Sequence, residues 1–459
     1  MSVPRRSPGA AESEPGETFS RLPTGSSADA RILTSASTTI RFSNGRVRQP
    51  HLERSTQVSF RVADGRRLAT ATGSDPSSEG LRKLLDSAMT LARIAPLEPR
   101  FPGFQAPKGR GPGRLALSRA TAKLGPEGAT RLAEEILEAA TAEAPGARVA
   151  GVVHVGRQTL RVANSSGLDR STESSVSYAS VLVERPDQDP PVSGWSEGAH
   201  WDAARLAPAT LGREAADRMA REPPSAVPPG NYAVVLRGPA VAELLMFLAH
   251  LGFAANGEVE GWSCLAHRRG KTVAPESVTL VDDPTSRATI PRAIDYEGTW
   301  ARRTPLITKG VAGPVVTDLI TAGRLGRPLT GHALPPEAPW GDYGPMPMNL
   351  VLAPGDASEQ ELVRETRRGL LVTRFHYVRV VDPGRGVITG MTRDGTYVIE
   401  NGEVVRPARN LRFTESVLTA LAGVRGIGKA RRTYSGGAES VTAPAIATRS
   451  FRFTSATLF

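Results

Sequence analysis

Polar and apolar positions alternate over the first patterned part of the chain. The segments ARILTSASTTIRFSNGRVRQ (30–49) and TQVSFRVADGRRLATATG (56–73) both alternate, and Asn44-Gly45 and Asp64-Gly65 supply turn signals. Alternation broken by such dipeptides predicts β-hairpins. The preceding residues are rich in Pro, Gly, Ser and Glu without periodicity. That composition predicts a disordered tail over residues 1–29.

Helical spacing of apolar residues follows. Residues 77–96 place Leu81, Leu85 and Ala88 on one face, and Pro96 ends the pattern. Similar patterns cover 126–146 and 208–223, and residues 147–186 between them read as strands. The order of strands, helices and strands favours an α+β fold with antiparallel strands over a doubly wound parallel sheet.

A proline-rich stretch, PPSAVPPGNY (223–232), is the clearest boundary. We therefore expect an N-terminal α+β domain with two to three helices over residues 30–225 and a β-rich C-terminal domain over residues 226–459. The second domain is predicted to begin with a buried strand and a helix in 241–261. Its other helices are expected within 318–326 and 413–423.

Length and composition narrow the class of protein. The chain has 459 residues, enough for two or three domains, and one cysteine, so no intrachain disulfide is possible. It carries 57 Lys and Arg against 46 Asp and Glu, scattered without a basic helix, which leaves nucleic acid a minor alternative partner. No apolar run is long enough to cross a membrane, and the N-terminus lacks a secretory pattern. We expect a cytoplasmic protein.

The helix in 241–261 has the general look of a zinc-peptidase helix but lacks its ligands. Such a helix needs a His-Glu pair and a second His one turn later, whereas Met246 and Phe247 occupy the place of the pair. None of the seven histidines is followed by Glu. A weak alternative ligand set is His250, Cys264 and His267. A helix-end His and a small buried Cys explain these residues better.

Several segments resemble one known family. LRGPAVAELLMFLAHLGF (236–253), LVDDPT (280–285), residues 294–326 and residues 380–421 are similar to the C-terminal domain of the TldD/PmbA peptidase family. The hairpin and helix patterns before residue 96 are similar to its N-terminal domain. The resemblance covers about residues 30–425.

The resemblance implies a particular kind of subunit. In this family, TldD-type chains bind zinc through a His-Glu-x-x-x-His helix and a later Cys, whereas TldE/PmbA-type chains lack these ligands and pair with the first kind. Here the helix reads LLMFLAH, and the later segment VRGIGKARR (424–432) has no Cys. The chain is therefore expected to be a non-catalytic subunit that binds no metal of its own, with zinc in its catalytic partner.

The family's chamber for unfolded or extended peptides suggests what such a subunit contributes. Asp295, Glu297 and Arg302 lie in the shared motif DYEGTWARR, either as a structural turn network, which we favour, or as peptide contacts. The expected partner is a TldD-type subunit in a heterodimer, with a homodimer formed in its absence. The alternatives are a standalone metallopeptidase with an unusual ligand set and a nucleic-acid-binding protein.

Overall fold

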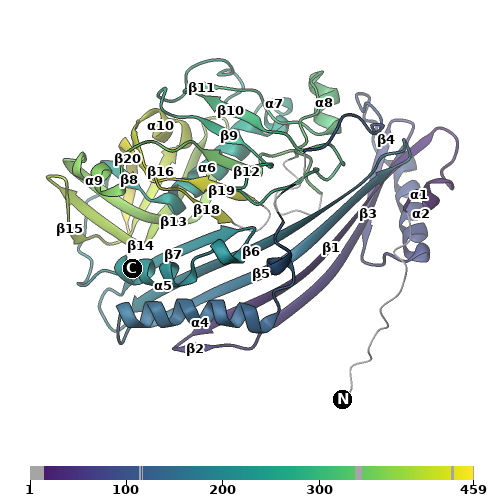
Figure 1. Ribbon diagram of the computed structural model, residues 1–459. Coiled ribbons are helices and arrows are strands. Elements are labelled where there is room, and N and C mark those ends of the chain that lie inside the picture. The colour runs from purple at the N-terminus through teal and green to yellow at the C-terminus, as the bar shows by residue number, and fades with distance from the viewer. Residues whose placement is uncertain (1–14, 113–114, 116, 336–343, 436–438, 458–459) are drawn as a thin grey trace.

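The computed structural model describes residues 15–112, 115, 117–335, 344–435 and 439–457. Within this part of the chain three β-sheets form the framework, as Figure 1 shows. The expected disordered tail over residues 1–29 is wrong for its second half. A short helix, α1 (Pro15–Phe19), precedes β1 (Ser26–Ser43), whose first residues pair with β3. Phe19 packs edge-on against Phe60, and this apolar contact orders the segment.

The first sheet is antiparallel, with strand order β4-β3-β1-β5-β6-β7. After β1, its strands are β2 (Arg46–Val47), β3 (His51–Asp64), β4 (Arg67–Gly73), β5 (Arg148–Asn164), β6 (Asp169–Arg185) and β7 (Val192–His200). Asn44 and Gly45 join β1 to β2 with φ of 53° and 71°, which is the left-handed turn that the Asn-Gly signal predicts.

Three helices cover one face of this sheet (Figure 1). They are α2 (Ser78–Ile94), α4 (Pro126–Glu143) and α5 (Pro208–Asp217), with α3 (Arg119–Ala122) as a short connector. Ser77 caps α2 through its hydroxyl, and the predicted stripe of Leu81, Leu85 and Ala88 is fully buried. The predicted end of the third helix at residue 223 is wrong, because the chain leaves the helix after Asp217 to bury Met219 in the core.

The other face of the first sheet packs against the C-terminal half. Leu160, Val162 and Leu168 form one apolar cluster with Ile294. Arg61 on β3 reaches across to Glu297 with an N–O distance of 2.7 Å. The two halves therefore share both apolar and charged contacts.

Two further sheets make up the C-terminal half. One has the order β11-β10-β9-β12-β19-β18, and the other β13-β8-β20-β16-β14-β15, where β13 also pairs with β14 and so closes a barrel-like ring. The strands are β8 (Gly230–Leu236), β9 (Leu280–Asp282), β10 (Thr304–Thr308), β11 (Val311–Ala312), β12 (Asn349–Leu352), β13 (Arg368–Asp382), β14 (Val387–Glu400), β15 (Glu403–Pro407), β16 (Leu411–Ser416), β17 (Val424–Ile427), β18 (Arg432–Ser435), β19 (Ser440–Ala443) and β20 (Ile446–Ala456).

A central helix, α6 (Gly238–Leu248), lies between these two sheets (Figure 1). It continues through a π-helical turn (Ala249–Phe253), breaks at the extended residue Ala254, and is followed by α7 (Ala255–Val259), so the helix predicted in 241–261 is confirmed up to Phe253. The remaining helices are α8 (Leu319–Leu325), α9 (Glu359–Arg364) and α10 (Val417–Ala422). The predicted helix in 413–423 is half wrong, because residues up to Ser416 pair as β16 with β14 and β20.

These elements confirm the α+β class, with an antiparallel first sheet and a β-rich C-terminal half whose two sheets are mixed, since β12–β19 and β13–β8 pair in parallel. The strands of the first sheet all run antiparallel to their neighbours, which excludes a doubly wound arrangement for that half. In the described part of the chain, no helix combines the length and apolar character that crossing a membrane requires.

Candidate functional site

The helix that would carry metal ligands is mostly core. Phe247 is 5% exposed and Leu251, four residues further on, is 1% exposed, so both side chains are packed in apolar surroundings. Met246 is half-buried and faces a cavity instead. The start of α6 is equally tight, because the Tyr434 hydroxyl lies where any side chain at Gly238 would sit.

The cavity beside Met246 has a volume of about 310 Å³ and lies between the two halves of the molecule. Its walls come from three parts of the fold. Glu197 lies on β7, Glu243 and Met246 lie on α6, and the β18–β19 hairpin contributes Tyr434 and, just before β19, Glu439. Three carboxyl groups thus converge on a space next to an otherwise apolar helix.

Burial and mutual repulsion perturb these acids. Burial, followed by the nearby Glu197 and Glu439 carboxylates, raises the pKa of Glu243 to about 7. Burial also raises the pKa values of Glu197 and Glu439. Glu197 accepts a hydrogen bond of 3.0 Å from the Tyr178 hydroxyl. The cavity therefore favours the protonated forms of its three acids more than water does.

The weak alternative ligand set is not brought together. His250 is buried beside the Trp262 ring, with ring centroids 5.6 Å apart, and burial lowers its pKa to about 4. Cys264 is also buried, which raises the pKa of its thiol to about 11, whereas His267 is exposed. The described residues contain no group of three His, Cys, Asp or Glu side chains arranged to hold a metal ion.

The motif DYEGTWARR forms a buried turn. The Asp295 carboxylate accepts hydrogen bonds from the backbone N–H groups of Glu297 (3.0 Å), Thr299 (2.8 Å) and Ala333 (3.0 Å). Asp295 is 2% exposed, so its oxygens are committed within the chain. This arrangement supports the structural turn network.

Glu297 has an equally internal role. Its carboxylate accepts a hydrogen bond from Arg61 at 2.7 Å and another from the backbone N–H of Leu319 at 2.8 Å, at the start of α8. It is 8% exposed. Arg302, by contrast, is exposed on the same loop, so of the three proposed motif residues it is the one whose side chain remains available to a ligand.

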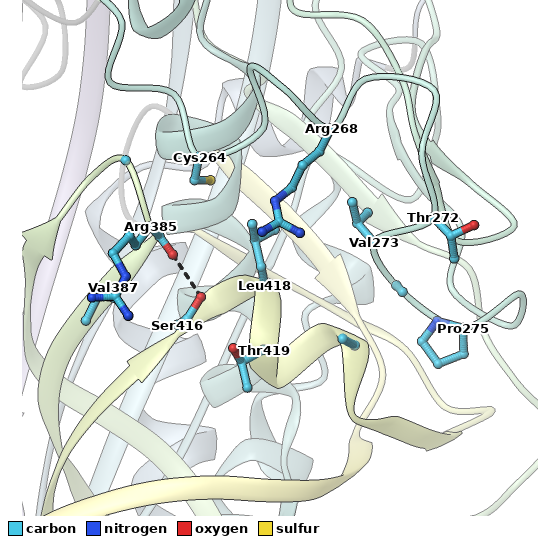
Figure 2. A pocket seen from close by; sticks show the side chains of 13 residues that line it. Cys264, Arg268, Thr272, Val273, Pro275, Arg385, Val387, Ser416, Leu418 and Thr419 are labelled. Carbon is cyan, nitrogen blue, oxygen red and sulfur yellow. Dashed lines mark hydrogen bonds between the residues drawn. The ribbon is translucent and has the colours of Figure 1, made fainter.

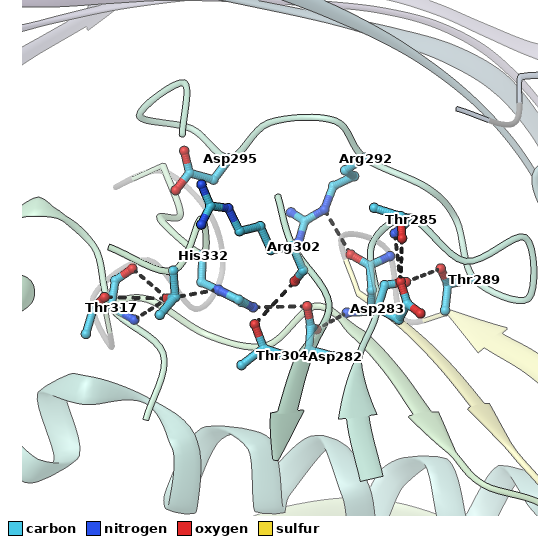
Figure 3. Close-up of polar contacts among 12 residues, drawn as sticks. Asp282, Asp283, Thr285, Thr289, Arg292, Asp295, Arg302, Thr304, Thr317 and His332 are labelled. Carbon is cyan, nitrogen blue, oxygen red and sulfur yellow. Dashed lines mark hydrogen bonds and ion pairs between the residues drawn. The ribbon is translucent and has the colours of Figure 1, made fainter. Parts of the chain in front are cut away.

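A second buried network lies next to this turn and was not foreseen from the sequence (Figure 3). His332 Nε2 lies 3.0 Å from Asp282 Oδ2, and its Nδ1 lies 3.0 Å from the Thr330 hydroxyl. Burial raises the pKa of the Asp282 carboxyl, but the charge and hydrogen bond of His332 and the N–H of Asn349 outweigh it, so this pKa lies below its usual value.

The Asp282–His332–Thr330 arrangement has the order of an acid, a base and a hydroxyl, yet it is structural. Both the Asp282 and His332 side chains are 0% exposed. The Thr330 hydroxyl donates to the Thr317 carbonyl (3.1 Å) and accepts from the Thr317 N–H (2.7 Å). A nucleophile needs an approachable oxygen, and this one is committed to the backbone.

Comparison with known proteins identifies the family to which this architecture belongs. Models of the PmbA/TldA metallopeptidases match domain 1 at residues 28–92, the central domain at 120–221 and the C-terminal domain at 229–455. The chain belongs to the PmbA/TldD metallopeptidase family. The resemblance seen in the sequence is therefore confirmed, and the first sheet accommodates the first two family domains.

Relatives within the PmbA/TldD family carry protease names. The chain is 30% identical over 221 residues to a metalloprotease of Methanothermobacter thermautotrophicus, covering 48% of this chain and 47% of that protein. It is 25% identical to a zinc metalloprotease TldD homolog of Saccharolobus solfataricus, covering 44% of each. The aligned segments thus span less than half the length of these curated relatives.

A solved structure shows the same fold over nearly the whole chain. The crystal structure of TldE from Thermococcus kodakarensis matches with a TM-score of 0.84 and 18% identity, covering 96% of this chain and 98% of that one. This PmbA/TldD family member thus shares its fold with a TldE.

Sequence reasoning missed the acids of the cavity. Glu243 did carry a signal, since it is the one charged residue in the apolar run AVAELLMFLAHLGF. Glu197 and Glu439 gave none, because only the fold brings β7 and β19 to the same helix.

Proposed function

We propose that this chain is a non-catalytic, TldE-like subunit that forms one wall of a peptide chamber beside a zinc-binding TldD-type partner. The observation that carries the proposal is α6 itself. It holds the central, buried position in the fold, but Met246, Phe247 and Leu251 occupy the His, Glu and His positions of the motif that the family resemblance implies. A zinc site needs three or four ligands, and this helix supplies none of them.

The substrate follows from the same resemblance. We infer that the paired subunits handle unfolded or extended peptides, since an enclosed chamber between two chains admits such segments more readily than folded domains. Exposed Arg302 is a candidate contact for a peptide carboxylate or carbonyl. The fully committed carboxylates of Asp295 and Glu297 support a scaffold role for the rest of the motif.

Exposed apolar residues near the end of β13 are our candidate for the partner contact. Tyr377 is 67% exposed, Val381 56% and Val380 38%. Tyr377 has a φ of 54° at an irregularity in the pairing of β13 with β14, so the backbone adopts a costly conformation that displays the ring. Exposed apolar residues grouped in this way support a protein contact.

The experiment is reconstitution with a TldD-type subunit from the same cell. Each chain is purified alone and the two are then mixed, and cleavage of an unfolded peptide and zinc content are measured for all three samples. We expect cleavage only in the mixture and stoichiometric zinc only in samples that contain the partner. About one zinc per chain in this protein alone, lost in a His250→Ala variant, would favour the standalone metallopeptidase.

A further inference from the structure

A separate cavity lies away from the site described above (Figure 2). It has a volume of about 600 Å³, which is within the range of pockets that hold small organic ligands. Three separate segments form it: residues 264–275, residues 384–387 around the turn before β14, and residues 416–422 at α10. None of these belongs to the α6 cavity.

Two arginines line this cavity without a carboxylate partner. In the described part of the chain, neither Arg268 nor Arg385 forms an ion pair or a side-chain hydrogen bond. The adjacent Arg269 behaves differently, since its guanidinium binds Glu258 at 2.7 Å and the Gly313 carbonyl at 3.0 Å. Arg268 and Arg385 are exposed at the cavity, and their guanidinium groups are free of protein partners within the described residues, whereas Arg269 is paired.

The rest of the lining is divided between hydroxyls and apolar groups. Thr272 and Thr419 place hydroxyl groups at the rim, and Ser416 donates to the Arg385 carbonyl at 2.9 Å (Figure 2). Val273 and Leu418, which are 7% and 8% exposed, provide an apolar part of the wall. A ligand that matches this lining carries a negative group on an apolar body.

We propose that this cavity binds a small amphipathic anion, held by Arg268 and Arg385 through a carboxylate or phosphate group and by Val273 and Leu418 through an apolar group. Guanidinium groups bind both anions in a bidentate manner, and the apolar wall adds affinity for ligands larger than the bare ion. The site is independent of the subunit role proposed above, because it uses no residue of α6 or of the DYEGTWARR turn.

The test is calorimetric titration of the full chain with four probes: N-acetylphenylalanine, its C-terminal amide, phenyl phosphate and inorganic phosphate. We expect the acid or phenyl phosphate to bind, with the amide and inorganic phosphate at least about tenfold weaker, since each lacks one half of the match. The stronger of the two anions identifies the chemical source of the negative group. Affinity should fall as salt concentration rises.

Variants then locate the site. Arg268→Gln and Arg385→Gln should each weaken binding about tenfold, because each removes a charged hydrogen-bonding group. Arg131→Gln, at an exposed position on α4, is the matched control and should bind as the wild type does. Thr419→Val offers a variant without a charge change and should weaken binding less. The proposal would be overturned if no probe bound at millimolar concentration, or if both arginine variants kept the wild-type affinity. Equal affinity for inorganic and phenyl phosphate would refute the proposed apolar contact with Val273 and Leu418.

Discussion

Glu243 is an acid in an apolar helix, and its protonation links the α6 cavity to pH. Its pKa of about 7 lies above the ordinary glutamate value of 4.5, because burial and two neighbouring carboxylates disfavour the charged form. Between these values the folded chain holds a proton that the unfolded chain has released. The stabilisation of the folded chain by this bound proton is fully present below pH 4.5 and is lost as pH rises through about 7.

Glu243→Gln should therefore stabilise the chain at alkaline pH and have little effect in acid. We expect the free energy of unfolding to rise by about 3 kcal/mol at pH 8, where the full shift from 4.5 to about 7 counts, with a difference near zero at pH 4. Urea unfolding at the two pH values measures this. Glu403→Gln, at an exposed position on β15, is the control and should show no such pH dependence. An equal gain at both pH values would contradict the assigned cause.

Substitutions at Glu297 and Arg302 distinguish a structural turn network from peptide contact as the role of the DYEGTWARR motif. Glu297→Gln leaves Arg61 with Asp29 as its one remaining acidic partner among the described residues and should cost about 3 kcal/mol of unfolding free energy. Arg302→Gln, at an exposed position, should change it by less than about 0.5 kcal/mol. Urea unfolding tests both. A Glu297→Gln variant of wild-type stability that loses peptide capture in the reconstituted pair would favour peptide contact.

At the scale of elements, α6 has a packing role that does not depend on metal ligands. Its side chains fill the space between two sheets, so removing the helix would open the largest hydrophobic core among the described residues. The same packing limits which positions of α6 could accept a polar side chain. Phe247 is buried, whereas Met246 faces the cavity.

Phe247→Glu should therefore destabilise the chain by about 4 kcal/mol, because it removes a packed ring and buries a carboxyl group without a partner. Met246→His should cost far less, since that side chain lies at the cavity wall. Thermal unfolding of the two variants gives the comparison. Similar melting temperatures would show that α6 retains room for a metal-ligand pair and would weaken the assignment as core.

The end of β13 is the element that we expect to meet the partner. Replacing both Tyr377 and Val381 by Ser should weaken the heterodimer at least about tenfold while leaving the stability of the isolated chain unchanged, because both side chains are exposed. Leu52→Ser, at a 62% exposed position on β3, is the control. Wild-type affinity in the double variant would show that the partner binds at another surface.

Elements with local signals were predictable, and those decided by distant pairing were not. The stripe of α2 and the Asn44-Gly45 turn follow from periodicity and from one dipeptide. The apolar run at 413–423 is ambiguous by itself, and β14 and β20 decide that its first residues become a strand. Ordered residues in 15–29 likewise depend on contacts with β3 and on the Phe60 ring.

At the scale of the whole molecule, the most informative features come from residues far apart in the chain. Glu197, Glu243 and Glu439 meet in one cavity, and Arg432 on β18 binds Glu214 on α5 through two contacts of 2.6 Å. The absence of a His-Glu pair was readable from the sequence, but the cavity next to it required the fold. The proposed subunit role requires a second chain, and permanent interfaces of that kind commonly bury about 2,000 Å² or more.

The most direct measurement is light scattering of the purified chain, of a TldD-type partner from the same cell and of their mixture at micromolar concentration. We predict one particle in the mixture with the combined mass of the two chains, and a self-associated dimer when the partner is absent. In the heterodimer we expect the two chains to be related by pseudo-two-fold symmetry. A chain that stays monomeric alone and does not change the scattering of the partner would contradict the subunit assignment.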